Sequence, residues 1–454
     1  MKKHISILSL LLALVLLLTS CQFVKNIIDK EDQEQNNQTN PKGYLDSAIA
    51  LASEKISISY TDAKDEGYLA FLQKLDSFAA KFSAAAYEKY GDGENIVVSP
   101  ISVYMALALV CECGEGETRQ EILDAVGVTY EEVNKYTKYL YAFCNQEFYD
   151  YNEANRKVLV GYELLTNSIW LNDGVPFKND GVQKLSQEYN CDVFQTQFGT
   201  DKAKNDLKAY IEEKTNGLID GNLPLNADTI FVLLNTFYLK DVWTRLGKDL
   251  DLSDKEYTFV NSNGTSVIKK LLVSKYTVGR VQEFDSYSVY YVKTLNGFKL
   301  YFMLPNHNNT VGDIFTQKNI ENVISISGWN GYEDMVCHNT RVLFPKFEAE
   351  FNESINDIMQ ENFGIVSLFD ADKCNVSNVI DGSAYCSNII HKSKLKVDEK
   401  GIEGAAVTVA IMAGSAQDPY TYEYHDFVVD RAFGFILTDQ YGTVLFSGVV
   451  NTID

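Results

Sequence analysis

Short apolar runs, each the length of a single strand, recur along this chain at irregular intervals, and this pattern constrains the fold more than any other feature. Helical patterns separate some of these runs but not others, so the chain lacks the regular alternation of a parallel βαβ sheet. The pattern therefore predicts the α+β class with large mixed sheets. The predicted strands lie within residues 95–99, 164–171, 230–239, 298–304, 341–347, 395–397, 433–437 and 444–450.

Helical periodicity is clearest in the first quarter of the chain. Apolar residues spaced three and four apart over residues 68–82 define one face of an amphipathic helix. Pro100 suits the first turn of a second helix, which continues through Met105 and Leu109. Further helices are predicted within residues 183–189, 202–215 and 355–363.

The beginning of the chain has the form of an export signal. Lys2 and Lys3 precede a mainly apolar run over residues 5–18, which ends just before Cys21. The run has fourteen residues, short of the roughly 20 that cross a bilayer core, so a membrane span is disfavoured. Residues 18–21 resemble the lipobox of bacterial lipoproteins. We therefore expect an extracytoplasmic protein, lipid-anchored at Cys21 to the bacterial membrane or cell surface.

Three parts of the chain are predicted from this start. Residues 1–20 form the signal peptide, residues 21–65 carry the lipidated cysteine and a flexible polar tether, and residues 66–454 form the folded domain. The tether includes residues 30–42, which contain no large apolar side chain to bury.

Charge and motifs exclude several classes of function. The net charge of -22 argues against nucleic acid and anionic membrane surfaces as partners, because both need basic patches. The common catalytic signatures are absent, so the chain is not predicted to be an enzyme. No cofactor and no metal is predicted, because no cluster of His, Cys and Asp has ligand spacing in the sequence.

The cysteines do not suggest a disulfide framework. Seven of the eight remain once Cys21 is lipidated, which is an odd number, and Cys111 lies two residues from Cys113 in a predicted helix. We expect reduced, buried cysteines that act as small hydrophobic residues.

Motifs spread over nearly the whole predicted domain resemble those of the serpin family, in the family's order and spacing. Residues 95–102 and 114–119 resemble the family's NIFFSPLS and GAKGDTR, and residues 234–243 resemble LVNALYFKGKW. Further matches lie at residues 166–170, 303–306, 343–347, 391–392, 397–401, 429–433 and 448–451.

This resemblance implies a serpin fold, with a large central mixed β-sheet, further sheets and a surrounding set of about eight or nine helices. It also implies a cluster of small and polar residues beneath the central sheet, the shutter, where strands part to admit another strand. The residues that match the shutter are Ser99, Ser102, Asn235 and His391, and Trp243 matches the breach at the top of the sheet. Taken singly, Ser99 is interpreted as a helix cap and His391 as a hydrogen-bonded core imidazole, and only the four residues together at the family's spacing favour the shutter.

By the same resemblance, residues 399–428 contain the reactive loop. Residues 402–412 are small or β-favouring, with no proline and one charge, Glu403, so this segment can become a strand. In a strand Ile402 and Glu403 face opposite sides, which leaves the charge in solvent if its side faces outward. The predicted hinge residues are Glu399, Lys400, Gly401, Ile402, Glu403, Gly404, Ala405, Ala406, Val407 and Thr408.

The resemblance implies a suicide inhibitor of serine endopeptidases, with cysteine endopeptidases as a further target class, acting as a monomer. A target protease attacks the loop, and the cleaved loop inserts into the sheet before the acyl-enzyme is hydrolysed. The alternative is a non-inhibitory surface lipoprotein of the same fold that binds a ligand or partner. The small hinge residues favour the inhibitor.

The loop departs from the family in two ways. Ile402 stands where the family usually has Thr or Ser, and the segment before Phe433 is several residues longer than usual. Counting from Glu399 places the scissile bond between Ser415 and Ala416, with Met412 as the main competitor and Tyr420 and Tyr422 ranked lower. The small residues predict elastase-like or subtilisin-like targets. Trypsin-like enzymes are disfavoured, because residues 401–423 contain no Lys or Arg.

Overall fold

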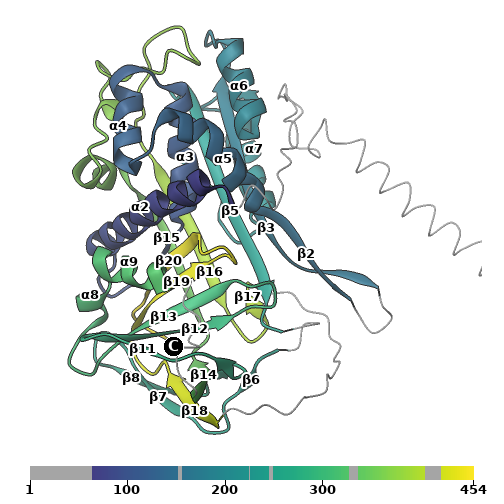
Figure 1. Cartoon of the computed structure of the whole chain (residues 1–454). Coiled ribbons are helices and arrows are strands. Elements are labelled where there is room, and N and C mark those ends of the chain that lie inside the picture. Colours follow the sequence, from purple (N-terminus) through teal and green to yellow (C-terminus); the bar gives the residue numbers. More distant parts are fainter. Residues whose placement is uncertain (1–63, 152–155, 224, 245–248, 327–335, 404–420) are drawn as a thin grey trace, which may run out of the picture.

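The computed structural model describes residues 64–151, 156–223, 225–244, 249–326, 336–403 and 421–454. Helices α3 to α7 gather at one end of the molecule, most strands of the two smaller sheets lie at the other, and α2 crosses between them (Figure 1). The α-helices are α2 (Glu66–Tyr90), α3 (Pro100–Cys113), α4 (Gly116–Val126), α5 (Tyr130–Phe143), α6 (Asn179–Tyr189), α7 (Asp201–Lys214), α8 (Val311–Ile314) and α9 (Gln317–Ser325), with short turns at Ile358–Asn362 and Ser367–Phe369.

The central sheet is mixed and has the strand order β15-β16-β17-β5-β3-β2, with β4 parallel to β3. Its long strands β3 and β5 are antiparallel and pair over most of their length. The strands are β2 (Asn145–Tyr151), β3 (Lys157–Asn172), β4 (Cys191–Thr196), β5 (Phe231–Val242), β15 (Phe347–Ser354), β16 (Ile390–Val397) and β17 (Gly401–Ile402).

A second sheet, with the order β1-β20-β19-β13-β12-β11, provides much of the core. Every residue of β19 and β20 is buried, as expected for strands covered on both faces. The strands are β1 (Ile96–Val98), β11 (Gln282–Glu283), β12 (Tyr287–Lys293), β13 (Lys299–Pro305), β19 (Phe433–Thr438) and β20 (Val444–Val450).

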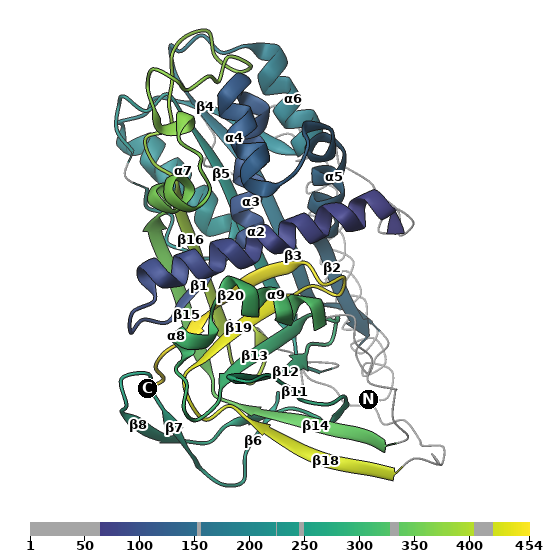
Figure 2. The same ribbon diagram turned by 60° about the vertical axis from the view of Figure 1, so that its left-hand side comes forward.

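A third sheet has the order β10-β14-β9-β6, and β18 pairs with β14 in parallel. Strands β14 and β18 run side by side and extend beyond the body of the molecule (Figure 2). The strands are β6 (Asp251–Leu252), β9 (Leu272–Val273), β10 (Thr277–Val278), β14 (Val336–Phe344) and β18 (Thr421–Val428), next to a hairpin of β7 (Tyr257–Val260) and β8 (Ser266–Lys269).

Helix α3 lies under the central sheet and is buried on nearly all sides. Pro100 occupies its first turn, where the missing N–H is not needed. Cys111 and Cys113 are both fully buried and free, and the thiols of Cys144, Cys191, Cys374 and Cys386 are also free of disulfides. The prediction of reduced, buried cysteines is therefore confirmed for this helix.

Two predicted elements differ from the structure. The single strand expected at residues 341–347 is divided between β14, which ends at Phe344, and β15, which begins at Phe347. Pro345 lies between them and has no N–H to donate to a ladder. The helix expected at residues 355–363 forms one π-helical turn, Ile358–Asn362.

Candidate functional site

The central sheet opens between β5 and β16. In the part of the chain that the structure describes, these two strands are joined only through the two residues of β17. The other edge of β5 pairs with β3, and the other edge of β16 pairs with β15. From β17 toward the end of the molecule where α3 to α7 gather, two strand edges therefore face each other without a ladder between them (Figure 1). Such edges are templates for an added strand.

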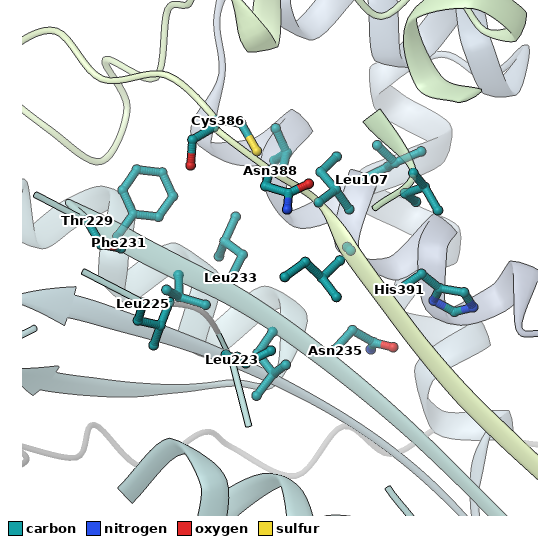
Figure 3. A pocket seen from close by; sticks show the side chains of 18 of the residues that line it. Leu107, Leu223, Leu225, Thr229, Phe231, Leu233, Asn235, Cys386, Asn388 and His391 are labelled. Atoms are coloured by element: carbon teal, nitrogen blue, oxygen red, sulfur yellow. The ribbon is translucent and has the colours of Figure 1, made fainter. Parts of the chain in front are cut away.

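A cavity of about 500 Å³ lies at this opening (Figure 3). Leu107 of α3 lines it from one face of the sheet, and Leu223 and Leu225, which follow α7, line it from the other. Phe231 and Leu233 of β5 add further apolar surface. The cavity thus passes between the two strands.

The chain enters the opening at its β17 end through a tight turn after β16. The Asp398 carboxylate accepts the N–H of Lys400 at 2.8 Å and of Gly401 at 3.3 Å. Gly401 pairs with Val242 of β5 so closely that a Cβ at this position would lie 2.0 Å from the Asp241 carbonyl oxygen. Glycine is therefore required where the chain re-enters the sheet.

Ile402 is the first hinge side chain within the sheet. Its backbone pairs with Val397 of β16 and Asp241 of β5, and its side chain is fully buried in the main core. The structure accommodates isoleucine at this position, a departure from the family pattern, by packing its side chain in the core on the buried face of the sheet.

Glu403 does not lie in solvent, as its expected strand position would have allowed. It is 8% exposed, and its backbone φ of 43° is in the left-handed region, which ends the strand at Ile402. The Tyr238 hydroxyl donates to one carboxylate oxygen at 2.7 Å, and the other oxygen is buried without a hydrogen-bond partner in the structure. Burial raises the pKa of this carboxyl group.

Trp243 supports the turn that leads into β17. Its indole N–H donates to the Asp398 carbonyl at 2.6 Å, and its ring packs edge-on against Phe344 at 5.6 Å between centroids. Because the indole is buried, this hydrogen bond is not exchanged for water. Trp243 therefore fixes the start of the hinge.

His391 and Ser99 meet beneath the end of the opening that is remote from β17. The Ser99 N–H donates to Nε2 of His391 at 3.0 Å, and the imidazole lies between the rings of Phe82 and Phe351. Burial lowers the pKa of His391 from 6.5 to about 3, so the ring is neutral near pH 7. Ser99 is not a side-chain helix cap, because its hydroxyl donates instead to the Leu445 carbonyl at 2.9 Å.

Ser102 and Asn235 link α3 to the sheet. The Ser102 hydroxyl donates to the side-chain oxygen of Asn235. The Asn235 amide donates to Asn167 at 2.8 Å and to the Thr166 carbonyl at 3.2 Å. Ser102, Asn235 and His391 all line the cavity, so the structure brings the four predicted shutter residues to one end of the opening.

Two further residues, not predicted as site residues, contribute to this region, although Lys392 lies within the motif match at residues 391–392. Ser393 lies two residues from His391 on the same face of β16 and donates to the Val97 carbonyl. Lys392, on the opposite face, donates to the carbonyls of Asp220 at 3.0 Å and Asn222 at 2.7 Å. Lys392 thereby ties β16 to the segment after α7.

Several predicted site residues lie outside the described residues, namely Cys21, Gly404, Ala405, Ala406, Val407, Thr408, Met412, Ser415, Ala416 and Tyr420. Residues 421–428, expected to be part of the loop, form β18 instead. Tyr422 pairs with Cys337 within that strand, which counts against it as a cleavage position. Among the described helices, none is both long and apolar enough to cross a membrane.

The fold, the divided sheet and the buried polar cluster define a serpin. The family model described as "Serpin (serine protease inhibitor)" matches residues 73–453, and the chain belongs to this family, as its motifs predict. Members are mostly protease inhibitors rather than enzymes, and the family implies protease partners in general.

Relatives are found in distant organisms. A serpin-like protein of Methanosarcina mazei is 25% identical over 81% of this chain and 84% of its own length. Serpin-Z4 of Arabidopsis thaliana is 24% identical over 79% of this chain and 92% of its own. The native structure of tengpin, a thermophilic serpin, is 21% identical, with a TM-score of 0.70 over 90% of this chain and all of tengpin. This last likeness shows the fold.

Replacing His391 by Gln should change how stability depends on pH. The unfolded imidazole binds a proton below about pH 6.5 and the buried one only near pH 3, so stability falls as pH drops through this window. Relative to His391→Gln, the wild type should lose about 1.4 kcal/mol of unfolding free energy per pH unit between pH 6 and pH 4.

Denaturant unfolding at several pH values measures this difference. Burial raises the pKa of Asp76 to about 7 and of Asp439 to about 6, but these groups are shared by both proteins. His307→Gln, the same substitution at an exposed histidine outside the opening, is measured alongside as the control. If the unfolding free energy depended on pH in the same way in the wild type and in His391→Gln, this would contradict a neutral buried imidazole.

Proposed function

We propose that this chain inhibits endopeptidases by inserting its cleaved loop as a new strand between β5 and β16. The single observation that carries the proposal is the pair of facing strand edges, already joined at one end by Gly401 and Ile402. A strand that continues β17 would pair on both sides and cover the apolar cavity.

The chemistry begins at the loop. The protease serine oxygen attacks the Ser415 carbonyl carbon, an ester forms, and the peptide bond to Ala416 breaks as its amine leaves with a proton. The freed segment then inserts and carries the bound protease with it. If each new ladder bond contributes about 1 kcal/mol, insertion yields on the order of 10 kcal/mol to deform the attached active site. Serine endopeptidases with small specificity pockets, elastase-like or subtilisin-like, fit residues around Ser415.

The observed register indicates where inserted residues would lie. Ile402 is opposite Val397 on one side and Asp241 on the other. Six residues further along each strand, Thr408 falls between His391 and Asn235, on the buried face. Small hinge residues therefore lead to the polar cluster, which offers hydrogen-bonding groups to an arriving threonine.

Glu403 supplies a reason for the native sheet to accept a strand. Its carboxylate now has one buried oxygen without a hydrogen-bond partner in the structure. In an extended β17, Glu403 would lie opposite Lys396, on the face of β16 that carries lysines. Burial raises the pKa of Glu403, while the charges of Lys240 and Lys396 already act against this rise, so insertion would relieve the burial of the unpartnered oxygen beside cations that are already near.

A ligand-binding serpin of the non-inhibitory kind is the second candidate. The cavity volume of about 500 Å³ is within the range of small-molecule sites, and its lining is largely apolar. A bound apolar ligand in the opening would block strand entry, so ligand binding and loop insertion would exclude each other.

We further propose that the protein acts outside the bacterial cytoplasm, held by lipid on Cys21. The support is the apolar run at residues 5–18 followed by the lipobox-like residues 18–21. A diacylated cysteine gives two acyl chains, enough for stable anchoring.

Incubation with elastase or subtilisin should give a covalent complex that survives boiling in detergent. The complex and a released peptide with a new amino terminus at Ala416 are expected, measured by gel electrophoresis and mass spectrometry. Trypsin should give no complex, because residues 401–423 offer no basic residue. Cleavage by every serine and cysteine protease tested, without any complex, would contradict inhibition.

Thr408→Glu should convert the inhibitor into a substrate. A carboxylate between His391 and Asn235 would be buried without a cation, which delays insertion until the ester is hydrolysed. Val407→Glu is the matched control, because the same carboxylate would lie opposite Lys392. Complex yield should fall at least about tenfold in the first variant and stay near wild type in the second. Equal yields of complex from the two variants would contradict the register that places Thr408 between His391 and Asn235.

Cleavage within residues 412–417 should raise the melting temperature. The inserted strand adds ladder bonds and fills the opening between β5 and β16. Scanning calorimetry before and after limited proteolysis measures the change, and nicked Thr408→Glu should show a smaller rise. An unchanged melting temperature in the nicked wild type would show that the loop stays outside the sheet.

Cys21→Ser should release the protein from membranes. Without the thioether the acyl chains cannot be attached at this position, so the variant should shift from the membrane to the soluble fraction. Cys374→Ser, a change in a half-buried cysteine of the folded domain, should leave partitioning unchanged. Equal membrane fractions for Cys21→Ser and wild type would exclude this anchor.

A further inference from the structure

Three side chains that can bind a metal meet at the projecting end of the third sheet. His338 lies on β14, and Glu423 and His425 lie on β18, the strand that follows the reactive loop. His338 is directly opposite Glu423, and His425 is two residues further along on the same face of β18. His338 is half-buried, while Glu423 and His425 are exposed. The site is therefore open to ions from solution.

The distances within this cluster match a tetrahedral metal. Nδ1 of His338 is 3.3 Å from Nε2 of His425, and each nitrogen is 3.5 Å from the same oxygen of Glu423. Zinc bonds of about 2.0–2.1 Å at tetrahedral angles separate the ligand atoms by about 3.3–3.4 Å. The three atoms thus outline one face of a tetrahedron, and the fourth position remains for water.

The sheet beneath the cluster holds it in place. On the same face of the two strands, Thr340, Val342 and Phe427 continue toward the core and are buried. On the opposite face, the Arg341 guanidinium binds the Asp426 carboxylate through two hydrogen bonds, of 2.7 and 3.0 Å. This bidentate pair joins β14 to β18 and fixes the register that aligns the two histidines.

We propose that His338, Glu423 and His425 bind a divalent transition-metal ion, with Zn²⁺ as the probe, and that the ion clips β18 to β14. Two imidazoles and one carboxylate with an open fourth position are a donor set that suits zinc. The carboxylate also offsets part of the ion's charge.

The clip has a consequence that rests on the proposed function. The uncut loop is fixed at both ends, at Glu403 beside β17 and at Thr421 in β18. Full insertion of an uncut loop would have to draw on chain beyond Thr421 and pull β18 from β14. A metal ion bound to both strands would oppose the separation of β18 from β14. Insertion after cleavage leaves β18 in place and would not be opposed. The ion would thus preserve the active form.

Calorimetric titration of the purified full chain with ZnCl₂ tests the site. We expect saturable binding of one ion, weakened at least about tenfold by His338→Ala and by His425→Ala. His307→Ala removes an exposed histidine outside the cluster and should leave the affinity unchanged. Melting temperatures measured without metal establish that each variant folds. Absence of saturable binding, or equal affinity in the His338→Ala/His425→Ala double variant, overturns the site.

Amide hydrogen exchange tests the clip itself. Zn²⁺ should slow exchange in residues 421–428 of the wild type and not in the double variant. Binding without any change in this exchange overturns the clip. Neither measurement uses a protease, so the metal site can fail while inhibition stands, and inhibition can fail while the metal site stands.

Discussion

The structure depends on backbone pairing that is left incomplete between β5 and β16. Each strand is paired along most or all of its outer side, and within the described residues only Gly401 and Ile402 bridge the inner sides. Because amide and carbonyl groups in a sheet favour ladder partners, this arrangement is stable only while side chains beneath it hold the strands in position. The hinge, the cavity and the polar cluster all lie along this one discontinuity.

The polar cluster is made of neutral hydrogen bonds. His391 accepts from a backbone N–H as an uncharged ring, and Ser102 and Asn235 bind through hydroxyl and amide groups. Neutral groups of this kind can exchange one partner for another at a cost of about 1 kcal/mol, whereas a buried ion pair would resist separation by several. The chemistry of the cluster therefore suits a sheet whose strands are to part.

Local pattern was enough to predict some elements and not others. Strand β20 and helix α3 follow from continuous apolar runs and a proline at the first turn, which act over short range. The burial of Glu403 depends on a left-handed backbone at one residue, which alternation cannot anticipate. His338 is 87 residues from His425, and only the parallel pairing of β14 and β18 brings them together.

Lys392 affects the rate of the proposed loop insertion as well as the structure of the sheet. Its ammonium group binds two carbonyls of the segment after α7, and this segment lies over the outer mouth of the opening. In the proposed mechanism both hydrogen bonds would break before a strand passes between β5 and β16. They would therefore raise the activation free energy of insertion and leave the free energy released by insertion unchanged. The competition between trapping a protease and releasing it is decided by that barrier, since ester hydrolysis runs concurrently. In the proposed mechanism Lys392 would therefore lower the rate of loop insertion without changing the free energy that insertion finally releases.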